Sequence, residues 1–105
     1  MRIIELDASG WKTALDYCEA MHTALGSPEG HGCSVDAFLD SIVWGGMNKV
    51  NPPYTIRIRN ITNLPKDILD EIEYLKDAIP KHRAEHITRK GYDVDVNMEI
   101  VPLSQ

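Results

Sequence analysis

Lysine and arginine are missing from residues 13–48, although the chain contains 11 of them. The charged side chains of this segment are Asp16, Glu19, Glu29, Asp36 and Asp40. Their combined charge equals the net charge of −5 carried by the whole 105-residue chain. Direct binding of nucleic acid needs a basic surface, so this distribution argues against that function. It favours a cationic partner, or it serves solubility alone.

Long apolar runs are also absent. No stretch approaches the roughly 18 residues that a membrane-spanning helix needs. The first residues include Glu5 and Asp7, where a secretory segment would need an unbroken apolar core. We therefore expect a cytoplasmic protein that has no contact with a membrane.

Cysteine is scarce, because the chain has only Cys18 and Cys33. Two cysteines form neither a disulfide framework nor a zinc motif, so we expect free thiols, no metal and no cofactor. Cys18 falls on the apolar side of a predicted helix and is interpreted as a packing residue. Cys33 lies close to His31, but two neighbours on one loop are a poor nucleophile and base. Nothing else in the sequence supports an enzyme.

The apolar patterns predict one α/β domain over residues 1–105. The predicted strands are residues 2–6, 54–61 and 94–101. The predicted helices are residues 11–25 with Asp7 or Ser9 as the cap, residues 34–44, and a region after Pro65 that ends at Gly91. Pro80 should kink or divide that last region. Helical crossovers between strands imply a small three-stranded parallel sheet packed with helices, in the order β-α-α-β-α-α-β.

The helix predicted over residues 34–44 has two different sides. The side expected to face the core holds Val35, Phe38, Leu39 and Ile42. Asp36, Asp40 and Trp44 follow one another at i, i+4 and i+8 on a column away from that side. The helix dipole gives Asp36 a local reason to be there, but not the other two. An aromatic aligned with acids is typical of a contact surface, although Trp44 could instead pack under Gly45–Gly46.

The same region resembles the signature of the barstar family, which are intracellular inhibitors of secreted ribonucleases. Residues 27–46 read SPEGHGCSVDAFLDSIVWGG, with a Pro-acid pair, a loop that ends in His-Gly, and an Asp-Ala-x-x-Asp segment. The flanking LDASGW, ALG and NPPYTIRIRN are similar to a bacterial branch of that family. The resemblance runs to about residue 61 and returns in the last strand, while residues 62–93 match only in helical character.

The resemblance implies an immunity protein that binds a ribonuclease, or another nuclease toxin with a basic active site. Asp40 would be the main plug of the cationic cleft, with Asp36 beside it. The candidate partner-binding residues are Glu29, Gly30, His31, Asp36, Asp40 and Trp44. The free protein is expected to be a monomer. The alternative is a non-inhibitory protein-interaction module with the same fold.

Three positions depart from the family pattern. Gly30 stands where the family often has an aromatic residue, and Cys33 where the better-known member has an acid. Ser34 replaces the usual asparagine but can still cap a helix. These differences bear on which nuclease is bound.

Two further groups of polar residues lie outside this segment. Arg57 and Arg59 alternate with isoleucines, and we expect them to pair with acids of the third helix, because a parallel sheet is normally covered on both faces. These acids are Asp70, Glu71 and Glu73. His82 and His86 are one turn apart and could hold a metal. The basic residues around them favour a solvated helix end instead.

Overall fold

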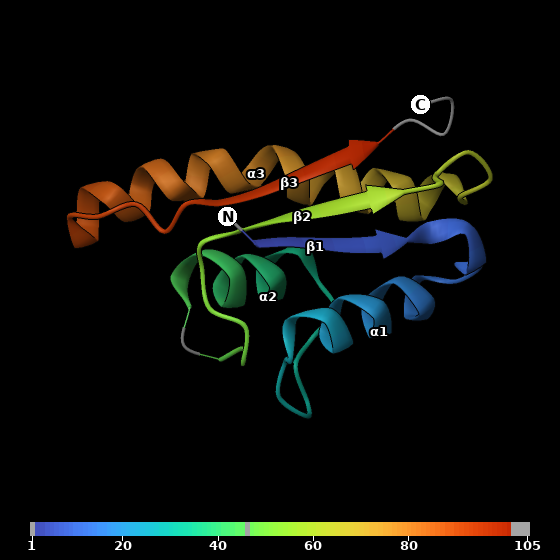
Figure 1. The fold of residues 1–105 in the computed structure, drawn as a ribbon, viewed down its shortest axis with the longest axis horizontal. Helices are drawn as coiled ribbons and strands as arrows, with labels where there is room; N and C mark the ends of the chain where they lie inside the picture. The colour runs from blue at the N-terminus through green and yellow to red at the C-terminus, as the bar shows by residue number, and fades with distance from the viewer. Residues whose placement is uncertain (1, 46, 102–105) are drawn as a thin grey trace.

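Three parallel strands form the centre of the fold (Figure 1). The structure is a computed structural model that describes residues 2–45 and 47–101. The strands lie in the order β1 (Arg2–Asp7), β2 (Tyr54–Arg59) and β3 (Val96–Val101). The helices are α1 (Ala14–Leu25), α2 (Val35–Leu39) and α3 (Lys66–Lys90), with short helical turns η1 (Ala8–Gly10) and η2 (Asp40–Trp44). The predicted three-stranded parallel α/β fold is therefore confirmed.

Burial alternates along the strands. Tyr54, Ile56 and Ile58 of β2 are buried, whereas the residues between them are partly exposed. Because successive side chains of a strand point to opposite faces, one face of the sheet packs on helices and the other meets solvent. Figure 1 shows α3 running along β3, with α1 and α2 beside β1.

The exposed face of the sheet carries an ion network. Glu5, Arg57 and Glu99 are register partners on β1, β2 and β3. Arg57 Nη1 lies 3.2 Å from Glu5 Oε1, and Arg57 Nε bonds to Glu99. These carboxylates, Glu99 first, raise the pKa of Arg57. Arg59 Nη1 lies 3.7 Å from Glu5 Oε2. The prediction that both arginines pair with the third helix is wrong, because that helix packs on the opposite, apolar face.

Helix α1 begins later than the apolar pattern predicted. Asp7 caps only the short 3-10 turn Ala8–Gly10. Thr13 caps α1 itself: its hydroxyl accepts the N–H of Asp16, and the Asp16 carboxylate accepts the N–H of Thr13. This reciprocal capping box satisfies two N–H groups that the first turn leaves unpaired. Trp11 therefore lies before the helix, where it is partly buried.

Helix α3 is one continuous helix of 25 residues that ends at Gly91 in the left-handed conformation. Pro80 lies inside it without dividing it, so the predicted separation into two helices is wrong. Pro80 is exposed. The carbonyl of Lys76, which loses its N–H partner to the proline, therefore lies on the solvent side of the helix. Among the described residues, no helix is both long and apolar enough to cross a membrane.

The end of α3 is attached to the segment that leads into β3. Arg83 forms two hydrogen bonds to the Asp93 carboxylate, at 3.0 and 2.6 Å, and donates to the carbonyl of Val96 at 3.2 Å. The Arg83 hydrogen bond is the main cause that lowers the pKa of Asp93 to about 2. His86 is buried, and its Nδ1 lies 3.0 Å from the carbonyl oxygen of Tyr92. The prediction of a solvated helix end is therefore wrong for His86.

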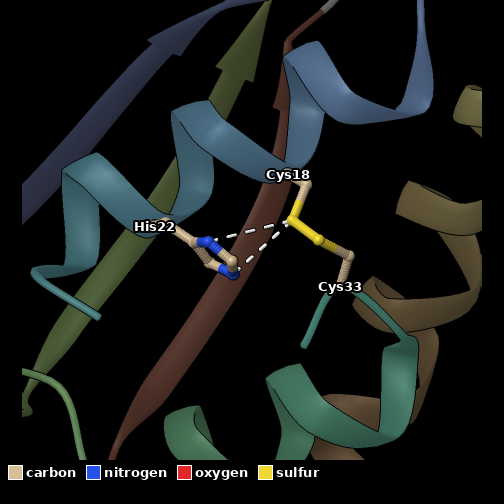
Figure 2. Close-up of side chains that lie close together, drawn as sticks. All are labelled: Cys18, His22 and Cys33. Atoms are coloured by element: carbon tan, nitrogen blue, oxygen red, sulfur yellow. Dashed lines mark hydrogen bonds between the residues drawn. A yellow bond between two sulfur atoms is a disulfide. The ribbon is translucent and has the colours of Figure 1, made fainter. Parts of the chain in front are cut away.

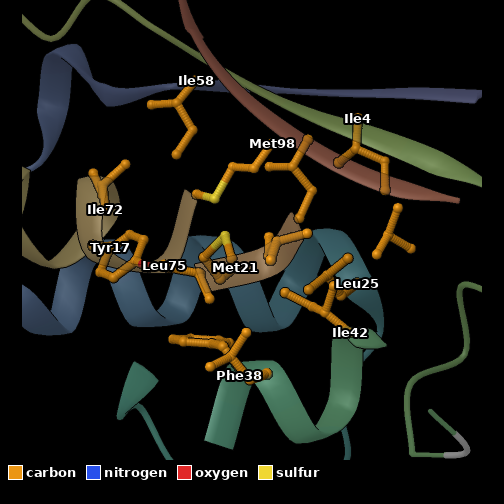
Figure 3. Packing of buried hydrophobic residues seen from close by; sticks show 14 of the residues in the cluster. Ile4, Tyr17, Met21, Leu25, Phe38, Ile42, Ile58, Ile72, Leu75 and Met98 are labelled. Atoms are coloured by element: carbon orange, nitrogen blue, oxygen red, sulfur yellow. The ribbon is translucent and has the colours of Figure 1, made fainter. Parts of the chain in front are cut away.

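The core lies between the sheet and the three helices (Figure 3). Its labelled members are Ile4, Ile58 and Met98 from the strands, Tyr17, Met21 and Leu25 from α1, Phe38 and Ile42 from α2 and η2, and Ile72 and Leu75 from α3. Full burial of one such side chain stabilises the fold by roughly 1.5–3 kcal/mol. Phe38, Leu39 and Ile42 are buried as predicted, and Val35 is partly buried. Because this side of the helix faces the core, Asp36 and Asp40 lie on its outer side.

Candidate functional site: an acidic loop and helix

The loop between α1 and α2 is fixed at both of its ends. Gly26 ends α1 in the left-handed conformation, at φ +64°. Ser34 caps α2, since its hydroxyl accepts the N–H of Ala37 at 3.1 Å. Between them, the N–H of His31 donates to the carbonyl of Pro28 at 3.1 Å and closes a turn.

Glu29 and Gly30 form the exposed tip of this loop. Gly30 has φ +85°, which favours glycine, and nothing lies within 4 Å of the place where a Cβ would stand. Glycine is therefore favoured at this position by the backbone conformation and not by crowding around it. The Glu29 carboxylate has no ion pair among the residues that the structure describes.

His31 lies deeper in the loop than Glu29 and Gly30 and is only partly exposed. Its ring centroid is 4.8 Å from that of His22 and 5.6 Å from that of Phe38. Its Nδ1 lies 2.6 Å from the carbonyl oxygen of Gly32. The loop therefore rests on the core through His31 while its tip projects outward.

A disulfide joins this loop to α1, between Cys18 and Cys33 (Figure 2). Their Cα atoms are 5.5 Å apart. Cys18 is buried, as its place on the apolar helix side predicted, whereas Cys33 is exposed. The expectation of free thiols is wrong, because the fold brings the loop back across the middle of α1. The number of residues between Cys18 and Cys33 could not show that the two side chains are close enough in the fold to form a disulfide.

Asp36 and Asp40 lie one helical turn apart and are both exposed. The N–H of Asp40 donates to the carbonyls of Asp36 and Ala37, which confirms their i, i+4 relationship. In the described part of the chain, neither carboxylate takes part in an ion pair. The first-turn position of Asp36 is favoured by the helix dipole. Asp40 has no such local compensation.

The helix changes its geometry after Asp40. Residues Asp40–Trp44 form a π turn, in which the N–H of Gly45 donates to the carbonyl of Asp40 at 2.9 Å. A π turn holds more residues than an α turn, so residues four apart no longer stand above one another. The predicted column therefore ends at Asp40 and does not continue to Trp44.

Trp44 packs against α3 instead of standing free. Its Nε1 donates to His82 Nδ1 at 3.2 Å, and its ring centroid lies 5.1 Å from that of His86. The guanidinium carbon of Arg89 is 5.6 Å from the ring centroid, within range for a cation–π contact. Trp44 remains partly exposed, so only part of it is open to a partner.

A groove of about 500 Å³ extends the acidic surface from α2 to α3. Asp36 lines it together with Asp67, Asp70, Glu71 and Tyr74. Asp67 was not among the residues predicted from the sequence, and Asp70 and Glu71 were expected to pair with the arginines of β2. The spacing of Asp67, Asp70 and Glu71, at i, i+3 and i+4, places the three acids on one side of α3. This spacing could have indicated the acidic surface from the sequence.

The fold and the exposed acids agree with one protein family. A profile described as Barstar (barnase inhibitor) matches residues 1–99 of the chain. The chain therefore belongs to the barstar family, whose proteins are inhibitors and not enzymes. The match includes α3, which resembled the family only in helical character. Membership implies a role like that of a ribonuclease inhibitor. No curated protein matches the sequence.

Proposed function

We propose that this chain is a stoichiometric inhibitor of a ribonuclease, or of another nuclease toxin with a basic active site. It occludes the cationic cleft with the loop and helix of residues 27–44. One observation carries the proposal: Asp36 and Asp40 are exposed, one turn apart, and without an ion pair among the described residues.

Unpaired carboxylates suit this role because a nuclease binds RNA phosphate with arginine and lysine. A carboxylate can accept two parallel hydrogen bonds from one guanidinium, which gives direction as well as attraction. Close charge pairs in the barnase–barstar complex have coupling energies of about 1.5–7 kcal/mol. We expect the bonds of Asp40 to the nuclease to be of this kind.

The position of each side chain supports the role that we propose for it. Asp40 is the main plug, and Asp36 lies beside it at the edge of the groove. The loop contacts come from Glu29, Gly30 and the exposed part of His31. At the far end, only the exposed part of Trp44 reaches the partner, because the ring also packs on His82 and His86 of α3.

The setting that we propose is the bacterial cytoplasm, where the protein acts as a monomeric immunity protein. A disulfide persists in oxidising compartments and is normally reduced in the cytosol. In this setting the Cys18–Cys33 pair is therefore open to reduction. Inhibition itself uses the acids of the loop and helix and no cofactor.

The test is a titration of RNA cleavage by barnase and by a basic nuclease from a neighbouring gene, where one is encoded there. One equivalent of the protein should abolish cleavage by the cognate enzyme. Asp40→Ala should need a large excess, while Glu19→Ala on α1 should behave as wild type. If neither nuclease loses activity, the chain is a non-inhibitory interaction module, and its partner must be captured directly.

A further inference from the structure

Three soft or borderline metal ligands meet beneath the acidic loop. Within the described residues, Cys18, His22 and Cys33 are the only group of three or more potential ligands whose donor atoms all lie close together, within 4.8 Å of one another. Figure 2 shows the His22 ring facing the Cys18 sulfur, with the Cys33 sulfur directly behind. Thiolate and imidazole together are the ligand set that zinc prefers in proteins.

The ring of His31 lies next to that of His22, at the side of this group. Its ring meets that of His22 edge-on, with the centroids 4.8 Å apart. Its Nε2 is buried and has no hydrogen-bond partner among the described residues. An unpaired buried nitrogen is costly, so this atom requires an explanation. A metal ion beside Cys18 and Cys33 would provide one.

The carbonyl of Gly32 orients both histidines. It lies 3.1 Å from His22 Nε2 and 2.6 Å from His31 Nδ1. A carbonyl only accepts, so each of these nitrogens carries the proton and the other nitrogen of each neutral ring keeps a lone pair. Metal-binding histidines almost always hold their second N–H on a carbonyl or carboxylate in this way. The free ligand atoms are therefore His22 Nδ1 and His31 Nε2.

The separation of Cys18 and His22 suits a tetrahedral site. Bonds of about 2.3 Å to sulfur and about 2.0–2.1 Å to nitrogen give donor separations of roughly 3.3–3.8 Å. Cys18 Sγ lies 3.9 Å from His22 Nδ1 and 3.5 Å from His22 Nε2. The two sulfurs are too close for such a site, because they are bonded to each other. Reduction lets them move apart to the separation that a metal needs.

We propose that the reduced protein binds one Zn²⁺ through Cys18, His22, His31 and Cys33. A dithiol first reduces the disulfide: it gives two electrons and two protons to the cysteine sulfurs and becomes a disulfide itself. Zn²⁺ then replaces the two thiol protons, which pass to the solvent. Cys33 is exposed and provides the way in, while Cys18 is buried.

The two states join the same two segments by different bonds. In the oxidised state the sulfur–sulfur bond joins α1 to the loop. In the reduced state zinc replaces that bond and also holds His31. Zinc binding does not depend on the proposed inhibition of a nuclease, so it can be tested on the isolated protein alone.

The experiment is a titration of the full chain with Zn²⁺, followed by calorimetry, in the oxidised state and after reduction by a dithiol that is then removed under anaerobic conditions. We expect one Zn²⁺ per reduced chain and no binding at that site by the oxidised chain. Co²⁺ in place of Zn²⁺ should show the intense thiolate-to-metal absorption of a tetrahedral site. Zinc should also protect both thiols from a thiol-reactive dye.

Variants identify the ligands. His22→Gln and His31→Gln should each lower the zinc affinity at least about tenfold, while the control His82→Gln should leave it unchanged. These variants keep both cysteines, so their oxidised forms can be checked for folding by circular dichroism. Equal zinc binding by the oxidised and reduced chains, or no thiolate absorption with Co²⁺, would overturn the proposal. Wild-type affinity in the His31→Gln variant would remove His31 from the site.

Discussion

The disulfide between Cys18 and Cys33 joins the middle of α1 to the end of the loop, directly before Ser34, the cap of α2. The bond therefore spans the loop that carries Glu29, Gly30 and His31. The bond holds the loop and the start of the acidic helix against α1. While the bond is intact, the loop loses less conformational freedom when it binds a partner.

We predict that loss of this disulfide destabilises the oxidised protein by about 3 kcal/mol. The cysteines are 15 residues apart, and the bond removes the freedom of that loop in the unfolded chain. Urea unfolding of wild type with and without a dithiol, in the presence of a metal chelator, measures the difference. The double variant Cys18→Ser, Cys33→Ser should not respond to the dithiol. Equal urea midpoints for oxidised and reduced wild type would contradict the prediction.

Trp44 should matter for stability through α3. Trp44→Phe keeps an aromatic ring but removes the hydrogen bond to His82, so we expect a loss of about 1 kcal/mol in the free energy of unfolding. The single variants Trp44→Phe and His82→Gln and the double variant form a cycle. If the two residues act as a pair, the double variant loses less than the sum of the single losses. Additive losses would show that the hydrogen bond contributes nothing.

The Arg83–Asp93 pair should give the fold an acid-dependent component. The pKa of Asp93 is lowered to about 2 in the folded protein, mainly by the Arg83 hydrogen bond, against about 3.9 in an unfolded chain. Its ionised form therefore stabilises the fold above about pH 4, and this contribution is lost as the pH falls towards 2. Asp93→Asn should be less stable than wild type at pH 7 and should approach it near pH 2, as measured by urea unfolding. A constant difference across that range would contradict the prediction.

The acids of α3 should affect the rate at which the nuclease associates more than the rate at which it dissociates. Asp67 and Glu71 line the groove beside Asp36, at the edge of the proposed contact. Changing such a rim charge mainly affects the association rate and its dependence on salt. The double variant Asp67→Asn, Glu71→Gln should associate more slowly at low salt, by less than about tenfold. Stopped-flow mixing at low and high salt tests this, and a changed dissociation rate with unchanged association would contradict it.

Local patterns in the sequence predicted much of the fold. Alternating isoleucines predicted β2, Ser34 predicted the start of α2, and Gly91 predicted the end of α3. Each of these features depends on residues a few positions apart. The exposure of Asp36 and Asp40 was predicted from the same kind of pattern. Phe38 and Leu39 lie on the buried side of the helix, which leaves the two acids on its outer side.

Features that depend on distant segments were not predicted. The approach of Cys33 to Cys18, and of Glu5 and Glu99 to Arg57, depends on how the elements pack. The π turn after Asp40 moves Trp44 onto α3, and the α-helical spacing of the sequence could not indicate it. The acids of α3 were assigned to the wrong partners for the same reason, because the covered face of the sheet was unknown.

The dissociation rate of the Asp40→Ala variant from its nuclease tests the proposed inhibition most directly. Loss of one partner of a buried charge pair costs 2 kcal/mol or more, so the variant should dissociate at least about 30-fold faster than wild type. Glu19→Ala removes the same charge from α1 and should dissociate at the wild-type rate. Equal rates for Asp40→Ala and wild type would show that Asp40 does not fill the active site.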